Sequence, residues 1–383
     1  MNIQQYVSQK KELYNYLMTF IDNENENEED DDFQNLISFI EKIELNNDIN
    51  EFKAFIHLLS KITKNHQSNQ LFFERIEKIF DHLKDHIKKF YSDSQIFHLF
   101  KNNKRMLLLL FQKQILTPDD TIINFIKITT DKNGTKYRHY FYPEIKPLIS
   151  DDLIRMIEGE LFEIDNNYSK NFEFNRQSCE NDSYICQLIR NDSVEDFVSY
   201  VNRANLSLSE SRVKPSLFET NRYLIINNPT YIEYAAFFGA IQIFRFLRIN
   251  GCQMNSSLPF YAIRGKNADI IHILEEDESL EISYMDCFNE SIKCHHNNIA
   301  HYFRDNFIDD DKYEKVNKFE YTQNYLENIF HYYNYEFFPD DFSNPFIFDY
   351  LCKYNYIEMV KIMLNAKSVS NINQKNISNH FEI

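Results

Sequence analysis

The sequence predicts an all-α protein. Only 5 of its 383 residues are glycine and 8 are proline, whereas the tight turns of β-hairpins commonly need Gly or Asn-Gly. Neither residue occurs before position 117, so no helix breaker interrupts the first part of the chain. Apolar residues also recur at helical spacing. One such series is Phe72, Ile76, Phe80, Leu83 and Ile87.

The first half of the chain is expected to form an N-terminal helical region over residues 1–180. The predicted helices cover residues 1–21, 33–45, 49–63, 71–91, 122–128 and 153–162, with a helix pair over 94–116. Residues 22–32 carry eight carboxylates, and this density of like charge predicts a solvated acidic loop. A partner-binding acidic segment is the alternative. Thr117-Pro118-Asp119-Asp120 predicts a helix start, with Thr117 as N-cap.

The stretch from Thr230 to Gly251 predicts two short helices joined by a tight turn. Ala235 and Ala236 give the first helix a face of small side chains, against which another helix can pack closely. Gly239 supplies the permissive backbone for the turn. Gly251 lies where a left-handed C-cap is expected.

Similar helix pairs are expected to repeat over residues 181–367. Each is aligned by the apolar pair that opens its second helix, and successive pairs lie about 30 residues apart after a longer first interval. These anchors are Phe197-Val198, Ile243-Phe244, Ile270-Ile271, Ile299-Ala300 and Met359-Val360, with a weaker one at Ile329-Phe330. Gly265 is assigned to the turn of the third unit. Residues 368–383 form a polar tail that should fray.

The central unit resembles one ankyrin repeat. The family pattern falls on Thr230, Ile232, Ala235, Ala236, Gly239, Ile243, Phe244, Phe246, Leu247 and Gly251. Tyr231 and Glu233 replace its usual Pro and His. The segments 231–239, 261–267 and 290–297 further resemble a large ankyrin-like protozoan family, expanded in trichomonad-type parasites, as do 97–107 and 141–146. The resemblance implies an ankyrin-like helical-repeat solenoid after the N-terminal region, and it implies no catalytic activity.

Composition argues against several other classes. The net charge of −17 opposes binding to nucleic acid, which depends on Lys and Arg contacts to phosphates. The glycine-rich phosphate-binding motifs are missing from the sequence. The longest apolar run, Met106 to Phe111, is far shorter than the roughly 20 residues of a membrane span. The polar start resembles no signal peptide, so we expect a cytoplasmic, monomeric protein with reduced cysteines and no cofactor.

One cluster of residue types could bind a metal. It comprises Cys287, Cys294, His295, His296 and His301. Zinc sites usually show two cysteines separated by two to four residues, and the spacing here is wider. We therefore expect structural roles for these side chains. A metal-dependent enzyme that uses Cys294, His295, His296 and His301 is the alternative function.

The favoured function is a non-enzymatic protein–protein interaction module, an adaptor or scaffold. Ankyrin-like stacks bind protein partners on a concave surface that repetition builds. The candidate contact residues precede the turns between paired helices. They are Phe237, Phe238, Arg264, Lys293, Lys353 and Tyr354. Exposed Phe237 and Phe238 would form an apolar hot spot beside a basic rim, unless neighbouring helices cover them. Alternatively, the N-terminal helices simply extend the solenoid.

Overall fold

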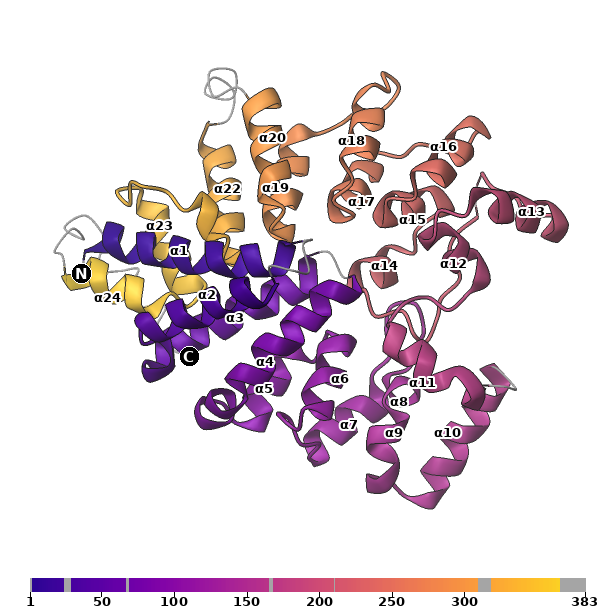
Figure 1. Ribbon diagram of the computed structural model, residues 1–383, viewed down its shortest axis with the longest axis horizontal. Helices are drawn as coiled ribbons and strands as arrows, with labels where there is room; N and C mark the ends of the chain where they lie inside the picture. The colour runs from indigo at the N-terminus through magenta and orange to yellow at the C-terminus, as the bar shows by residue number, and fades with distance from the viewer. Residues whose placement is uncertain are drawn as a thin grey trace. The chain divides into compact units, whose positions relative to one another are not determined.

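The computed structural model describes residues 2–23, 29–66, 69–164, 168–209, 211–308 and 318–365 (Figure 1). Every regular element in these ranges is a helix, and the only pairings of β type there are isolated bridges between Thr130 and Lys136 and between Arg212 and Thr230. The all-α prediction is therefore confirmed. Among the described helices, each is too short or too polar to cross a membrane. The predicted polar tail at 368–383 lies outside the described residues.

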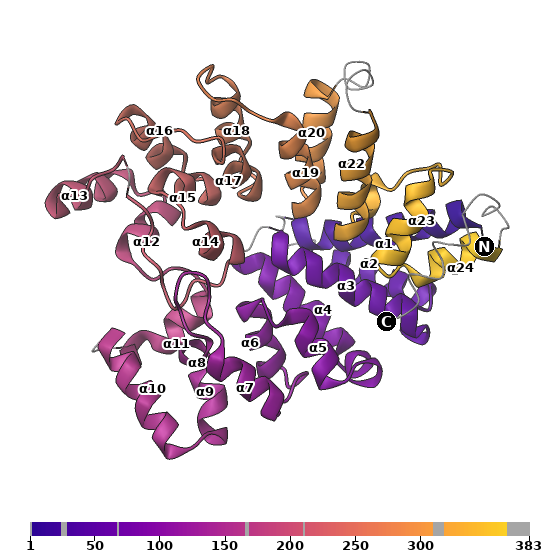
Figure 2. The ribbon, with the colours of Figure 1, turned by 180° about the vertical axis from the view of Figure 1, so that it is seen from behind.

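The chain folds into two compact units, and they divide it differently from the expected boundary near residue 180. Unit 1 combines residues 1–66 and 71–76 with 283–383, whereas unit 2 comprises 67–70 and 77–282. The two ends of the chain thus belong to one unit, and Figures 1 and 2 both show indigo helices beside yellow ones. The N-terminal helices pack on the C-terminal ones. Contacts between residues far apart in the sequence therefore set the division of the chain into two units.

In the described ranges, ten helical segments lie wholly within unit 1. They are α1 (Ile3–Asp22), α2 (Glu29–Lys42), η1 (Leu45–Asn47), α3 (Ile49–Asn65), α19 (Tyr284–Cys294), α20 (Asn297–Phe307), α22 (Lys318–Tyr332), η3 (Tyr335–Phe337), α23 (Pro345–Lys353) and α24 (Ile357–Asn365). Glu29, Asp30, Asp31 and Asp32 form the first turn of α2. The predicted acidic loop is wrong for these four residues, because carboxylates stabilise the positive end of a helix. Residues 24–28 of that loop lie outside the described ranges.

The two units share α4 (Gln70–Phe90), of which residues 71–76 belong to unit 1 and the rest to unit 2. The other helices of unit 2 are α5 (Asp93–Phe100), α6 (Lys104–Gln112), α7 (Asp120–Ile128), α8 (Tyr137–Tyr140), α9 (Tyr142–Ile145), η2 (Lys146–Leu148), α10 (Asp151–Ile164), α11 (Tyr168–Ser178), α12 (Tyr184–Arg190), α13 (Val194–Ala204), α14 (Arg222–Asn227), α15 (Tyr231–Phe238), α16 (Ile241–Ile249), α17 (Leu258–Arg264) and α18 (Ala268–Glu275). Asp119, and not Thr117, caps α7, since its side chain accepts the Ile122 N–H.

Among the described residues, six short turns that join two helical segments directly share one geometry, and Gln114, Asn205 and Gly251 give the same cap to helices that are followed by longer connections. Each of the six turns contains a residue with left-handed backbone: Asp192, Gly239, Lys266, His295, Tyr333 and Asn355, with φ between +49° and +68°. In each turn the next N–H donates to the carbonyl five residues earlier, as Ala240 does to Ala235 and His296 does to Ser291. This bond is typical of the Schellman C-cap. A recurring local unit therefore exists in both halves of the described repeat region.

The helices that precede these turns, here called first helices, lie against one another. In unit 2, α15 packs between α12 and α17; in unit 1, α22 packs between α19 and α23. The weak anchor at Ile329-Phe330 is wrong, because these residues end the first helix α22 and the turn at Tyr333 leads into η3. Residues 313–317 of that unit lie outside the described ranges. Whether all pairs form one ankyrin-like solenoid stays a prediction.

Gly265 has a different role from the one expected. Lys266 takes the left-handed position of this turn, with φ +54°, whereas Gly265 keeps a negative φ. A Cβ built on Gly265 would lie 2.3 Å from the carbonyl oxygen of Phe237. The glycine is therefore needed because the ends of α15 and α17 touch through their backbones.

Candidate recognition surface

The six predicted contact residues fall into two groups. Phe237, Phe238 and Arg264 belong to unit 2, whereas Lys293, Lys353 and Tyr354 belong to unit 1. Each group lies at the C-terminal ends of first helices.

Phe238 lies in a small cluster of aromatic rings and a cation, which we call the Phe238 patch (Arg190, Tyr234 and Phe238). The Phe238 ring is half-buried, with its centroid 4.7 Å from that of Tyr234. The Arg190 guanidinium lies 5.8 Å from the Phe238 ring centroid. A half-exposed ring with a cation beside it is a combination that binding hot spots favour.

Arg190 is held firmly in this position. Its guanidinium donates to the Tyr234 hydroxyl at 2.8 Å and to the Asn181 carbonyl at 2.9 Å, and it forms an ion pair with Glu180 at 2.8 Å. The guanidinium is thereby fixed over the ring in advance of binding, which lowers the entropic cost of binding.

Phe237 and Arg264 are buried, which corrects their prediction as exposed contact residues. Phe237 is 7% exposed and Arg264 is 5% exposed. The backbone at the end of α17 also approaches the Phe237 carbonyl oxygen closely. The Arg264 guanidinium stacks 3.9 Å from the ring centroid of Tyr223. Both residues therefore shape the unit from within.

Tyr354 belongs to a second cluster, the Tyr354 patch (Glu327, His331, Lys353 and Tyr354). One carboxylate oxygen of Glu327 accepts from Lys353 Nζ at 2.6 Å and from the Tyr354 hydroxyl at 2.7 Å. The Tyr354 and His331 rings stack with centroids 4.9 Å apart and an interplanar angle of 13°. Burial lowers the pKa of His331 to about 4, so the stack is uncharged at neutral pH, with Lys353 exposed beside it.

Lys293 is the remaining candidate. Its side chain is half-buried and forms an ion pair with Glu290 one helical turn away, at 3.1 Å. Such short-range ion pairs near the surface are weak, so this ammonium group can exchange Glu290 for another carboxylate.

The six turns reveal a pattern that the sequence prediction missed. The position two residues before each left-handed residue holds Arg190, Phe237, Arg264, Lys293, His331 and Lys353. Four of these six residues are Arg or Lys, although the chain as a whole is acidic. Arg190 and His331 were not predicted. Aligning the segments by their turns, rather than by the apolar pair of the second helix, would have found both.

The proposed metal ligands form no metal site. Cys294, His295 and His296 are buried, whereas His301 is half-exposed and bonded to Glu336 at 3.1 Å. Among the described residues, no group of three or more His, Cys, Asp or Glu side chains is arranged to hold a metal.

The buried histidines instead connect helices within unit 1. His295 Nδ1 lies 2.9 Å from the Tyr14 hydroxyl, and burial lowers the pKa of His295 to about 3. His66 bonds both the Cys294 carbonyl oxygen at 2.8 Å and Asp22 at 2.9 Å. The turn between α19 and α20 is thereby tied to α1 and to the end of α3.

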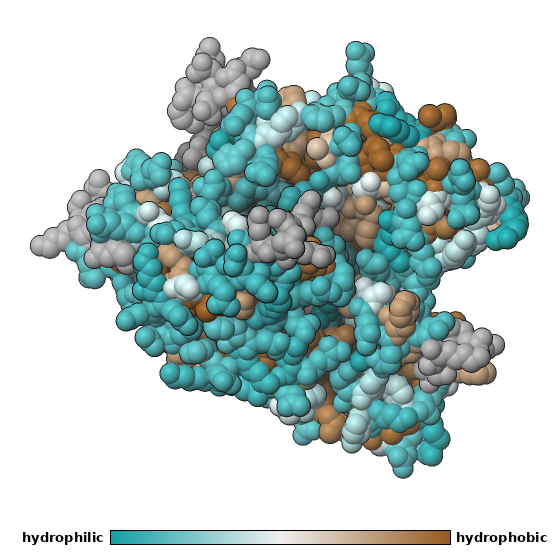
Figure 3. Space-filling view, viewed as in Figure 1, coloured by the Kyte–Doolittle hydropathy of each residue, from teal (hydrophilic) through white to brown (hydrophobic). Residues whose placement is uncertain are grey.

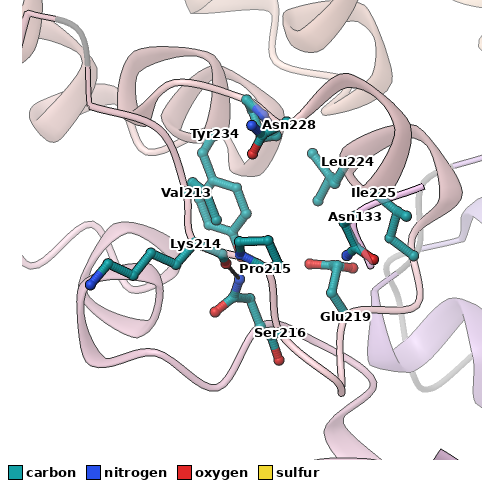
Figure 4. Close-up of a pocket in the computed structure, with 12 residues that line it drawn as sticks. Asn133, Val213, Lys214, Pro215, Ser216, Glu219, Leu224, Ile225, Asn228 and Tyr234 are labelled. Atoms are coloured by element: carbon teal, nitrogen blue, oxygen red, sulfur yellow. Dashed lines mark hydrogen bonds between the residues drawn. The ribbon is translucent and has the colours of Figure 1, made fainter. Parts of the chain in front are cut away.

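Unit 2 also has a small, partly open cavity beside a buried carboxyl group. Figure 4 shows the Glu219 carboxylate beside Asn133, in a pocket lined by Val213, Leu224 and Tyr234. The cavity measures about 20 Å³, the space of one water molecule. One Glu219 oxygen accepts the Asn221 N–H at 2.8 Å, and the other has no hydrogen-bond partner among the described residues.

The chemistry of this carboxyl group follows from its burial. Glu219 is 5% exposed, and desolvation raises its pKa to about 7. Arg190 and Lys104 oppose this shift, whereas Glu180 adds to it. The cavity is too small for an organic substrate, so we assign this group to proton-dependent stability and not to catalysis.

Comparison of the chain with known protein families, with curated proteins and with solved structures finds no match. The resemblance to ankyrin-like repeats therefore stays a prediction from the residues.

Proposed function

We propose that the chain is a non-enzymatic protein–protein interaction module, an adaptor or scaffold that binds a protein partner at the ends of its first helices. The observation that carries this proposal is the equivalent position in the six short turns that follow first helices. That position holds a cation or an aromatic ring in all six turns, four of them at least partly exposed, whereas Phe237 and Arg264 are buried. Surfaces of this kind are typical of helical-repeat proteins that bind partners by shape.

The chemistry of the patches indicates which partner would fit. Phe238 and Tyr354 offer half-exposed rings, and Arg190 and Lys353 offer cations beside them. A partner segment with an apolar side chain next to a carboxylate would complement either patch. The rings would supply most of the affinity, because partly exposed surface ion pairs contribute little.

Affinity capture tests this proposal with three baits: the natural chain, Phe238→Ser and Ile249→Ser. Ile249 is the matched control, since it is 84% exposed on the second helix α16. A partner that contacts the Phe238 patch is expected to be captured from lysate of the source cells by the natural chain and by Ile249→Ser, and lost with Phe238→Ser. Phe237 is left unchanged because it is buried. Far-UV circular dichroism must show equal helicity for the three chains. Equal capture by all three would remove this surface as the binding site.

A further inference from the structure

Helix α10 in unit 2 exposes apolar side chains on one face. Met156 is 44% exposed and Phe162 is 57% exposed. The opposite face buries Ile157 and Leu161, and the helix packs with α8 and α11. Figure 3 shows hydrophobic surface at the part of unit 2 that contains α10 and α11.

The inward side of α10 is firmly anchored. Glu160 accepts hydrogen bonds from Arg138 at 2.7 Å and from Lys136 at 2.8 Å, and it bonds His139 at 2.6 Å. The Arg138 guanidinium, together with Lys136 and His139, holds the pKa of the Glu160 carboxyl well below its usual range. Glu160 therefore stays ionised and bonded at neutral pH, which fixes the rotation of α10. The face with Met156 and Phe162 consequently stays turned outward.

Gly159 lies at the centre of this outward face, three residues from both Met156 and Phe162. A glycine within a helix is destabilising relative to alanine. Unlike Gly265, Gly159 is required by no contact in the described structure: a Cβ built there meets nothing within 4 Å. The open space at Gly159 leaves room for another backbone to approach closely, which is one use of glycine.

We infer that α10 pairs with α10 of a second copy of this chain, in antiparallel orientation and crossing at Gly159. A residue that precedes Gly159 by a given number of positions then lies at the same height along the helix pair as the residue that follows Gly159 of the second copy by that number. Met156 lies level with Phe162 of the second copy, and Arg155 with Glu163 of the second copy. A two-fold axis repeats each contact. The interface is therefore self-complementary in both apolar contact and charge.

Charge selects the antiparallel orientation. A parallel pair in register would place Arg155 against Arg155 and Glu163 against Glu163. In the single chain Arg155 pairs with Asp152, and their side chains are 73% and 90% exposed. Such an exposed pair is weak, so Arg155 can turn to Glu163 of the second copy. A single helix pair buries less area than most stable interfaces, so the dimer is weak and replaces the monomer expected from the sequence.

Sedimentation velocity over a concentration series tests this inference with the full chain. The natural chain is expected to dimerise as concentration rises. Arg155→Glu and Glu163→Arg should each weaken the dimer about tenfold, because each creates two like-charge contacts. The combined exchange, Arg155→Glu with Glu163→Arg, should restore the dimer. Gly159→Leu should abolish it by preventing close approach.

All three substituted positions are exposed, and circular dichroism checks that the helices form in each variant. A natural chain that stays monomeric at every concentration overturns the inference. So does a combined exchange that dimerises no better than either single variant. Partner capture through the Phe238 patch is a separate measurement, so either proposal can fail without the other.

Discussion

Glu219 shows how burial changes the behaviour of a single residue. A carboxyl group without a countercharge is costly to ionise away from water. With its pKa raised to about 7, the folded chain keeps this proton at pH values where the unfolded chain has lost it. Between the ordinary value of 4.5 and about 7, the folded state binds more protons, so this residue lowers stability as pH rises.

Glu219→Gln is therefore expected to stabilise the chain above pH 7 and to have much less effect near pH 4.5. The amide keeps the shape and stays neutral at both pH values. The difference in unfolding free energy between the two chains should grow by about 3 kcal/mol over this range. Urea unfolding at several pH values measures it. A difference that does not change with pH would contradict the assignment of a neutral, buried carboxyl.

Residue-scale predictions of exposure failed where a neighbouring helix decided the outcome. Phe237, Phe238, Arg264 and Lys353 all lie at the C-terminal ends of first helices. Only Phe237 and Arg264 are buried. Helical periodicity gives a residue's position on its own helix, whereas burial depends on the next helix in the stack. The contact between Gly265 and Phe237 is such a tertiary effect.

At the scale of elements, the stretch Thr230–Gly251 was predicted well. It forms α15 and α16, with Thr230 and Glu233 in a capping box and left-handed glycines at 239 and 251. These features are local, so the sequence contains them. The other five turns place Asp192, Lys266, His295, Tyr333 and Asn355 in left-handed backbone. Asp, His and Asn adopt that conformation more often than other residues with a Cβ, whereas Lys266 and Tyr333 are of types that seldom do. Packing on both sides of the turn therefore sets the backbone of those two residues.

Gly265→Ala tests the backbone contact between α15 and α17. The new methyl group would meet the Phe237 carbonyl, which is held inside a helix and cannot move freely. We expect a loss of about 3 kcal/mol in unfolding free energy, typical of overpacking. Denaturant unfolding measures this loss.

Lys266→Gly is the matched control for that substitution. It lies one residue further along the same turn, where φ is +54°, and glycine relieves the left-handed backbone. It should raise stability by about 0.5–1 kcal/mol. A Gly265→Ala chain as stable as the natural chain would contradict the close backbone contact between α15 and α17.

At the scale of the whole molecule, the sequence predicted the helical class but not the division into units. Apolar periodicity is a local property, and the joining of residues 1–66 to the C-terminal helices depends on contacts far apart in sequence. Tyr14 and His295 illustrate this, since 281 positions separate two side chains that meet in the core of unit 1. The Tyr354 patch belongs to this unit, so its shape depends on the N-terminal helices.

Hydrogen exchange on a chain that lacks residues 2–66 tests this architecture most directly. Without α1 and α3, the apolar faces of α19, α22 and α24 lose their cover. We predict that amides of these helices lose protection relative to the full chain, while those of α15 to α18 in unit 2 keep theirs. Equal protection of α19, α22 and α24 in both chains would contradict a unit built from the two ends of the chain.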